Sequence, residues 1–301
     1  MTQQVSSIVP CLWLNDQAEE AAEFYMRLFP RGRLRARSYY PSSRDNQSGR
    51  PRGSVCVVEF EVAGQRFTLL NGGPMFTPNP SISFFYVTDS VAEVDRICAG
   101  LLDGGKALMA LGEYPWSRRY GWIQDRYGIS FQVMVGTPLP GGAAMAPCLM
   151  FADALHGKAE EALTTYVHIL GGAVDSLARY GEGTPTAGTI SHGRFQLAGQ
   201  AMVAMDAHGR HGFTFNQGIS LQILCADQAE LDRRWASLSE GGERGPCGWL
   251  QDRFGLYWQV VPADMAEWIG AADRVASERA FLAVMEMEKL DIAAIRAAFA
   301  S

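Results

Sequence analysis

An aromatic and basic segment at 112–122, GEYPWSRRYGW, carries the side chains best suited to bind a small molecule. Its candidate residues are Tyr114, Trp116, Arg118, Arg119 and Trp122. Aromatic faces and guanidinium groups recognise planar and anionic molecules. The segment therefore predicts a ligand-binding wall, and the alternative is a surface loop that folds over neighbouring strands as packing.

Two glutamines and a histidine extend this candidate site. Gln132 follows Phe131 and Gln259 follows Trp258, on strands predicted from their apolar residues. A buried amide must find hydrogen-bond partners, so each glutamine either holds a polar group of a ligand or ties strands together. His192 lies in another predicted strand, either as an acid–base or hydrogen-bonding group of the site or as a satisfied strand histidine.

Other potential ligands and nucleophiles have weaker support. Asp206, His208 and His211 are close enough in sequence to chelate a cation, but the matching stretch LNGGPMFTP in the first half of the chain has no ligands, which favours a solvated turn. Cys11 and Cys148 have no histidine or acidic residue nearby in sequence, which favours inert core thiols. The sequence therefore predicts no metal site and assigns no catalytic residue.

The elements that must position these residues occur twice. PCLWLNDQAEEAAEFY at 10–25 matches PCLMFADALHGKAEEALTTY at 147–166, and GWIQDRYGISFQVMV at 121–135 matches GWLQDRFGLYWQVVP at 248–262. A period of about 137 residues indicates duplicated domains rather than a solenoid. We predict module one at 1–137, a linker at 138–145, module two at 146–262 and a helical tail at 263–301.

Within module one, the hydrophobic period changes twice from strand-like to helical. The pattern predicts a strand at 10–14, a helix at 18–29 and strands at 34–39, 55–62 and 66–70. The order then repeats, with a strand at 82–87, a helix that begins after Asp89 or Ser90, and strands at 107–111, near 120–123 and at 130–135. Each module is thus a pair of β-α-β-β-β units, and the fold class is α+β with C-terminal helices.

Two segments depart from a simple duplication. Glu243 and Gly248 are 5 positions apart, whereas Lys106 and Gly121 are 15 apart, so module two is predicted to lack one strand and a loop. After Pro262 the pattern becomes helical and predicts a short helix at 263–270 and one long helix from about 272 to 298.

Composition excludes several classes of function. The net charge is −6 with a pI near 5.4, so nucleic acid is not an expected partner. No stretch of eighteen apolar residues predicts a membrane span. The six cysteines form no Cys-x-x-Cys pair, and the chain begins without a signal-like segment, so we expect a cytoplasmic protein with free thiols.

The paired β-α-β-β-β units resemble the vicinal oxygen chelate superfamily, which includes glyoxalase I, bleomycin-resistance proteins and extradiol dioxygenases. More narrowly, PCLWLNDQAEEAAEFY, CGWLQDRFGLYWQVVP and MEMEKLDIAAIRAAF are similar to the PhnB-like group, often labelled 3-demethylubiquinone-9 3-methyltransferase-like. The resemblance covers nearly the whole chain. It implies that two units curl their strands into a cup, and that metal ligands, where present, lie on the inward faces of particular strands.

The resemblance also implies where such ligands would lie. The positions fall at or beside Pro10, Ile82, Pro147 and Ile219 and at Gln132 and Gln259. Proline and isoleucine are not metal ligands and glutamine is a weak neutral one. We therefore predict no cofactor, with a divalent metal as the alternative.

These observations favour a protein that binds a small molecule in a metal-free cup. The alternatives are a metal-dependent lyase, isomerase or dioxygenase of the same superfamily, and a structural or oligomerisation module. Methyltransferase activity is not expected, because the paired glycines indicate turns and the unit order differs from a doubly wound sheet.

The chain is expected either to form a homodimer or to be a self-contained pseudo-dimer. Module one keeps the aromatic segment and module two holds every histidine, which predicts a binding half and a scaffolding half.

Overall fold

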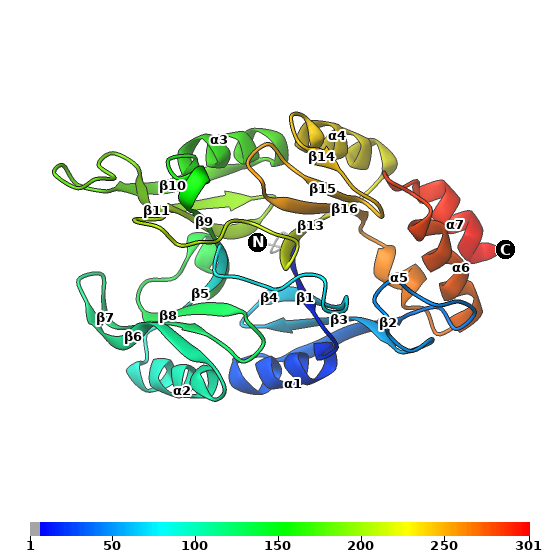
Figure 1. Cartoon of the computed structure of the whole chain (residues 1–301), viewed down its shortest axis with the longest axis horizontal. Coiled ribbons are helices and arrows are strands. Elements are labelled where there is room, and N and C mark those ends of the chain that lie inside the picture. The colour runs from blue at the N-terminus through cyan, green and yellow to red at the C-terminus, as the bar shows by residue number, and fades with distance from the viewer. Residues whose placement is uncertain (1–6) are drawn as a thin grey trace.

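Two eight-stranded sheets form the centre of the molecule in the computed structural model, which describes residues 7–301 (Figure 1). Sheet A contains β1 (Ile8–Leu14), β2 (Arg33–Tyr39), β3 (Val55–Val62), β4 (Gln65–Asn71), β13 (Ile219–Cys225), β14 (Glu243–Arg244), β15 (Trp249–Gln251) and β16 (Tyr257–Pro262). Sheet B contains β5 (Ile82–Thr88), β6 (Lys106–Tyr114), β7 (Ser117–Gln124), β8 (Ser130–Val135), β9 (Met145–Phe151), β10 (Gly172–Arg179), β11 (Ile190–Leu197) and β12 (Gln200–Asp206).

Each sheet combines one unit from each module. The strand order is β14-β15-β16-β13-β1-β4-β3-β2 in sheet A and β10-β11-β12-β9-β5-β8-β7-β6 in sheet B. The modules join where β1 runs antiparallel to β13, with Cys11 opposite Ser220, and where β5 runs antiparallel to β9, with Ser83 opposite Cys148. The predicted division into a binding module and a scaffolding module is therefore wrong, because neither sheet belongs to one module.

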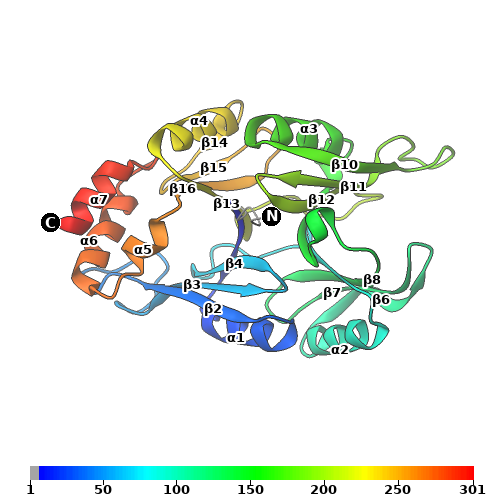
Figure 2. The same ribbon diagram turned by 180° about the vertical axis from the view of Figure 1, so that it is seen from behind.

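Seven α-helices accompany the sheets within residues 7–301. They are α1 (Ala18–Leu28), α2 (Val91–Leu102), α3 (Ala159–Leu170), α4 (Gln228–Ser239), α5 (Met265–Ile269), α6 (Arg274–Met285) and α7 (Ile292–Ala300), and two short 3-10 turns lie at Pro140–Gly142 and Asp153–Leu155. Helices α1 and α2 cover one outer face of the molecule and α3 and α4 the opposite one (Figures 1 and 2). The expected α+β duplication with C-terminal helices is confirmed.

The helices are held by apolar faces and by two buried turns. Helix α1 buries Ala21, Ala22 and Tyr25 on one side, as its spacing predicts. The Tyr25 hydroxyl donates to the carboxylate of Asp125, in the turn between β7 and β8, at 2.7 Å. The equivalent bond in module two joins Tyr166 to Asp252, also at 2.7 Å.

Two local predictions are corrected. The strand expected to be missing from module two survives as the two-residue β14, whose Glu243 and Arg244 pair with β15. In module one the same region is not a loop. The aromatic segment lies in the β6–β7 hairpin, where Tyr114 pairs with Ser117 across the turn.

The single long tail helix is also corrected, because α6 ends at Met285 and α7 begins at Ile292. Leu290 is completely buried between them, and the Asp291 side chain accepts from the Ala294 backbone N–H as the N-cap of α7. Among residues 7–301, no helix has the length and apolar character needed to cross a membrane.

Candidate ligand-binding site

The inward face of sheet B gathers Tyr114, Trp122, Gln132 and His192 of the predicted site residues, and we call this face cup B. Because side chains alternate along a strand, every second residue of the central strands points to this face. The cluster there is formed by Phe85, Val87, Tyr120, Leu139, Ala146, Cys148, Ala201 and Val203, with Met109, Tyr114, Trp122, Met134 and Met205 packed against it. We call the corresponding face of sheet A cup A.

Contacts between distant strands show that both sheets are curled. In sheet B, Phe85 and His192 lie three strands apart, yet their ring centroids are 5.5 Å apart. In sheet A, the rings of Trp13 and Trp249 also span three strands and lie 6.2 Å apart. Three strand spacings on a flat sheet would be about 14 Å, so these side chains meet across a concave surface.

Gln132 forms the polar centre of cup B. Its Oε1 accepts from the Tyr120 hydroxyl at 2.7 Å, and its Nε2 donates to Ser83 Oγ at 2.9 Å. The Cys148 thiol lies beside Ser83 and Gln132. Burial raises the pKa of this thiol to about 12, and its hydrogen bonds with Ser83 and Gln132 lower the pKa by a smaller amount. Gln132 therefore ties β7, β8 and β5 together, with its amide partnered on both sides.

The equivalent glutamine, Gln259, lies in cup A and so is separated from the other predicted residues. Its Nε2 donates to Ser220 Oγ at 2.9 Å and its Oε1 accepts from Gln222 at 3.2 Å. Gln222 in turn accepts from the Thr68 hydroxyl at 2.7 Å. Burial raises the pKa of the neighbouring Cys11 thiol to about 11. Cup A thus has a longer polar chain than cup B.

The donor sets of both cups do not fit a divalent metal. The residues beside the implied first-strand positions are Cys11, Ser83, Cys148 and Ser220. Burial keeps both thiols protonated, and the glutamine amides are engaged in hydrogen bonds. Such a metal needs anionic or imidazole ligands. Within residues 7–301, no group of three His, Cys, Asp or Glu side chains is arranged to hold one.

The aromatic segment divides between the two faces of its hairpin. Tyr114 stacks on Trp116 with centroids 5.1 Å apart, and both rings contact Tyr120 edge-on. Trp116 stands at the hairpin tip and is 55% exposed. Trp122 pairs with Gln132 across β7 and β8 and shares its face of the sheet.

The two arginines of this segment are engaged by groups outside the polar centre of cup B. Arg119 Nε forms an ion pair with Asp95 of α2 at 2.6 Å. Arg118 is exposed and donates to the backbone carbonyl of Asp89 at 3.0 Å. The alternation of β7 explains the outward position of Arg119, because Tyr120 and Trp122 occupy the inward phase. Arg118 shares the phase of Tyr120 and Trp122, but it lies near the exposed tip of the hairpin.

His192 lies on β11 at the opposite wall of cup B. Burial lowers the pKa of its imidazole, and the nearby positive charge of Arg194 lowers it further. Four methionines, missed in the sequence, also line cup B: Met109, Met134, Met150 and Met205. Alternation along their strands is the signal that would have found them.

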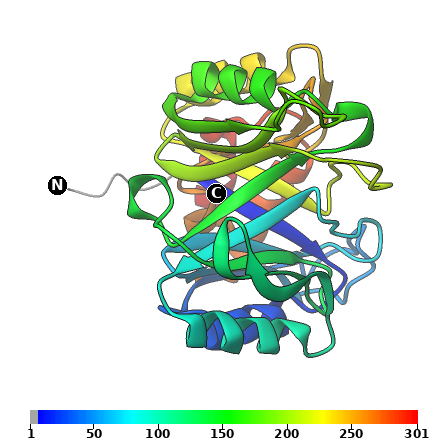
Figure 3. The ribbon, with the colours of Figure 1, turned by 90° about the vertical axis from the view of Figure 1, so that its left-hand side faces the viewer.

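The C-terminal tail distinguishes the two cups. On one side, Arg274 of α6 lies 3.5 Å from the ring centroid of Tyr39 on β2. On the other, the backbone N–H groups of Cys247 and Gly248 donate to the carbonyls of Met287 and Glu288, at 2.7 and 2.8 Å. The tail thus contacts both edges of sheet A and spans the opening of cup A (Figures 1 and 3). At sheet B, the linker's 3-10 turn at Pro140–Gly142 packs against β11 and β12.

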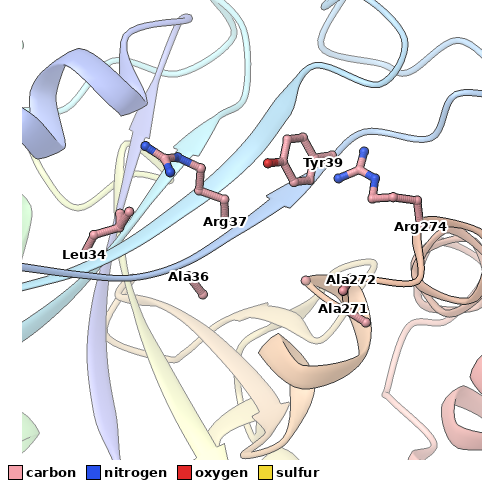
Figure 4. A pocket seen from close by; sticks show the side chains of 8 residues that line it. Leu34, Ala36, Arg37, Tyr39, Ala271, Ala272 and Arg274 are labelled. Carbon is pink, nitrogen blue, oxygen red and sulfur yellow. The ribbon is translucent and has the colours of Figure 1, made fainter.

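Two surface hollows lie outside both cups. One, of about 550 Å³, is bounded by β2 and the α5–α6 connection (Figure 4). Its side chains include Ala36, Ala271 and Ala272, with Arg274 held against Tyr39 at its rim. The other, of about 800 Å³, lies between α3 and α4. Neither contains a residue of the predicted site.

Comparisons with known proteins place the fold. The family model described as 3-demethylubiquinone-9 3-methyltransferase matches twice, at residues 6–134 and 143–261. No curated protein matches the chain. A PhnB protein from Bacillus cereus is 31% identical over 42% of this chain and 98% of its own, with a TM-score of 0.38. A Pseudomonas aeruginosa protein is 23% identical over 42% and 93%, with a TM-score of 0.35. Glyoxalase I from Zea mays is 13% identical over 85% and 92%, with a TM-score of 0.53.

Proposed function

Since the chain belongs to the 3-demethylubiquinone-9 3-methyltransferase family, within the vicinal oxygen chelate superfamily, we propose that it binds a small, largely apolar molecule in cup B without a metal. The observation that carries this proposal is the contrast between the cups. The C-terminal helices span cup A, whereas the methionine and aromatic wall of cup B is contacted by the linker, through Leu139 and the 3-10 turn at Pro140–Gly142.

Substitutions between the modules support the same assignment. Where cup A has the hydrogen-bonded Gln222 and Thr68, cup B has Phe85 and Val203 at the equivalent positions. Methionine side chains are flexible and polarizable, and they adapt to ligands of different shape. Because the cup B side chains pack against one another, entry of a ligand requires them to move, which methionines do at low cost.

Catalysis that depends on a divalent metal is the weaker alternative, because the central donors of both cups are neutral. We expect protein purified without chelator to contain no stoichiometric Zn, Fe, Mn or Ni. Elemental analysis of the purified protein checks this prediction, and one tightly bound metal per chain would contradict it.

Methyl transfer is not part of the proposal, in spite of the family's name. The strands and helices form β-α-β-β-β units, whereas a doubly wound sheet with a glycine-rich first turn is the usual frame for such a nucleotide-derived cofactor. Methylation of a ubiquinone precursor by the purified protein would overturn this expectation.

The proposed binding is tested by thermal shift with a panel of small aromatic and aliphatic compounds. A ligand at about 100 times its Kd adds about 2.7 kcal/mol to the free energy of unfolding, which raises the melting temperature. In the double variant F85Q/V203T, which gives cup B the polar residues of cup A, we expect each ligand-induced shift to be lost.

The matched control is Q222F/T68V, which changes the equivalent positions of cup A. This variant should retain the ligand-induced shift, measured against its own ligand-free melting temperature. Absence of any shift across a broad panel, or equal loss in both double variants, would refute binding in cup B.

A further inference from the structure

Trp122 carries a buried hydrogen-bond donor without an acceptor. Its indole Nε1 is inaccessible to solvent and has no hydrogen-bond partner in the structure. Buried donors are nearly always paired, because leaving one unpaired costs the free energy of its lost hydration. An unpaired N–H in a binding cup therefore indicates a group that a ligand satisfies.

Two other indole N–H groups are paired within the chain. Trp13 Nε1 donates to the carbonyl of Gly73 at 2.8 Å, and Trp258 Nε1 donates to the carboxylate of Asp252 at 2.7 Å. Trp13 is the instructive comparison because it lies in cup A, where the tail spans the opening. The indole N–H of Trp13 in cup A is therefore satisfied from within the chain, whereas that of Trp122 in cup B is not.

The position of Trp122 places this donor among the groups that a ligand would meet. It lies opposite Gln132 on the inward face, and its indole packs against the cluster of Met150, Ala152 and Ala207 on the far wall. The indole therefore extends across the concave surface, between the polar centre at Gln132 and the apolar wall.

The charges around cup B favour a neutral acceptor over an anion. Arg119 is turned away and paired with Asp95, and Arg118 donates to the Asp89 carbonyl. Arg194 is in an ion pair with Asp175 and donates to the Pro138 carbonyl, although its Nε has no hydrogen-bond partner. An anion bound beside Trp122 would lose hydration without gaining a free cation. A carbonyl oxygen accepts one hydrogen bond at a much smaller desolvation cost.

We propose that Trp122 is the specificity-determining residue of cup B, and that its indole N–H donates to the carbonyl oxygen of an otherwise apolar ligand such as an aryl ketone. This inference rests on the proposed function, since it requires a ligand in cup B. It goes further by naming the ligand's functional group and the atom that recognises it.

Two nearly isosteric probes, 2-acetylnaphthalene and 2-ethylnaphthalene, test the assignment because only the first has a carbonyl acceptor. Isothermal titration calorimetry should give a Kd for the ketone that is about 10-fold lower or more. In Trp122→Phe the ratio of the two Kd values should fall close to one. The matched variant Trp249→Phe, at the equivalent position in cup A, should retain the native ratio.

A second readout avoids dependence on how well the variant folds. In the native protein labelled with ¹⁵N at tryptophan, the indole N–H signal of Trp122, identified by its loss in Trp122→Phe, should move on addition of the ketone and much less with the hydrocarbon. Binding of both probes with equal affinity would overturn the role of Trp122 and leave the proposed function standing. Failure of both probes to bind would overturn this inference, and the thermal-shift panel would then decide whether the proposed function fails as well.

Discussion

Asp125 and Asp252 are buried carboxyl groups in equivalent turns, and their environments differ in one donor. Both accept from a tyrosine hydroxyl and from two backbone N–H groups. Asp252 also accepts from the indole N–H of Trp258 at 2.7 Å. Burial raises the pKa of both carboxyls, to about 6 for Asp125.

The raised pKa of Asp125 predicts a pH-dependent contribution to stability. The folded protein holds the proton more tightly than the unfolded chain, whose carboxyl titrates near 3.8. This contribution is therefore fully present below about pH 4 and is lost as the pH rises through about 6. Urea unfolding of native protein and Asp125→Asn between pH 4 and 7 should show the native free energy of unfolding falling relative to the variant. Parallel curves would contradict the assignment.

Removing the tyrosine hydroxyls should affect the two turns unequally. Tyr25→Phe leaves the Oδ2 of Asp125 without a side-chain donor and should lower the free energy of unfolding by about 1–3 kcal/mol. Tyr166→Phe should cost less, because Trp258 still donates to the same carboxylate oxygen of Asp252. Chemical denaturation at pH 7 measures both losses, and a larger loss for Tyr166→Phe would count against this reasoning.

The types of the site residues could be predicted from the sequence, but the face of the sheet to which each side chain points could not. The segment at 112–122 is recognisably suited to binding, yet its side chains are divided between the two faces of β7. Which phase points inward depends on the pairing of β7 with β8 and on the α2 helix that takes Arg119. The methionines of cup B were missed because methionine in a strand is also an ordinary core residue.

At the scale of elements, the units were predictable because strand and helix periods are local properties. The N-cap at Ser90 was one of two predicted residues, and its side chain accepts from the Glu93 backbone N–H. The break in the tail was not predictable from spacing, since apolar residues continue across it. It depends on a distant partner, because Leu290 contacts Gly248 and its carbonyl accepts from Gln228.

Leu290 is the residue through which this account of the tail can be tested. Because its side chain is completely buried, Leu290→Ala should lower the free energy of unfolding by about 2–5 kcal/mol. The control is Leu102→Ala at the end of α2, where the side chain is 38% exposed and a much smaller loss is expected. Denaturant titration measures the free energy of unfolding of both variants. Equal losses of this free energy would contradict the tight packing of the tail against sheet A.

At the scale of the whole molecule, the exchange of units between modules could not be predicted from the pattern. All four units have similar periods, so pairing a unit with its neighbour or with the other module satisfies the same local preferences. The observed pairing joins β1 to β13 and β5 to β9, and these contacts are long-range. Only the complete set of packing interactions decides whether a unit pairs within its own module or with a unit of the other module.

This pairing predicts that module one alone is not a stable monomer. In a fragment of residues 1–142, β1 and β5 would lose their partners β13 and β9 and expose strand edges. We expect the fragment to self-associate by supplying the missing partners from a second copy, while the full chain stays a monomer as a self-contained pseudo-dimer. Light scattering coupled to size exclusion measures both masses. A monomeric, cooperatively folded fragment would contradict the prediction.

The most direct test of the central claim, that cup B and not cup A takes the ligand, is a methyl NMR titration of protein labelled with ¹³C at its methionine methyl groups. Met109, Met134, Met150 and Met205 report on cup B, and Met285 and Met287 report on the tail that spans cup A. On titration with 2-acetylnaphthalene, the cup B methyl signals should shift saturably, and the signals of Met285 and Met287 should stay unchanged. Shifts confined to the tail methionines, or no shifts at all, would contradict it.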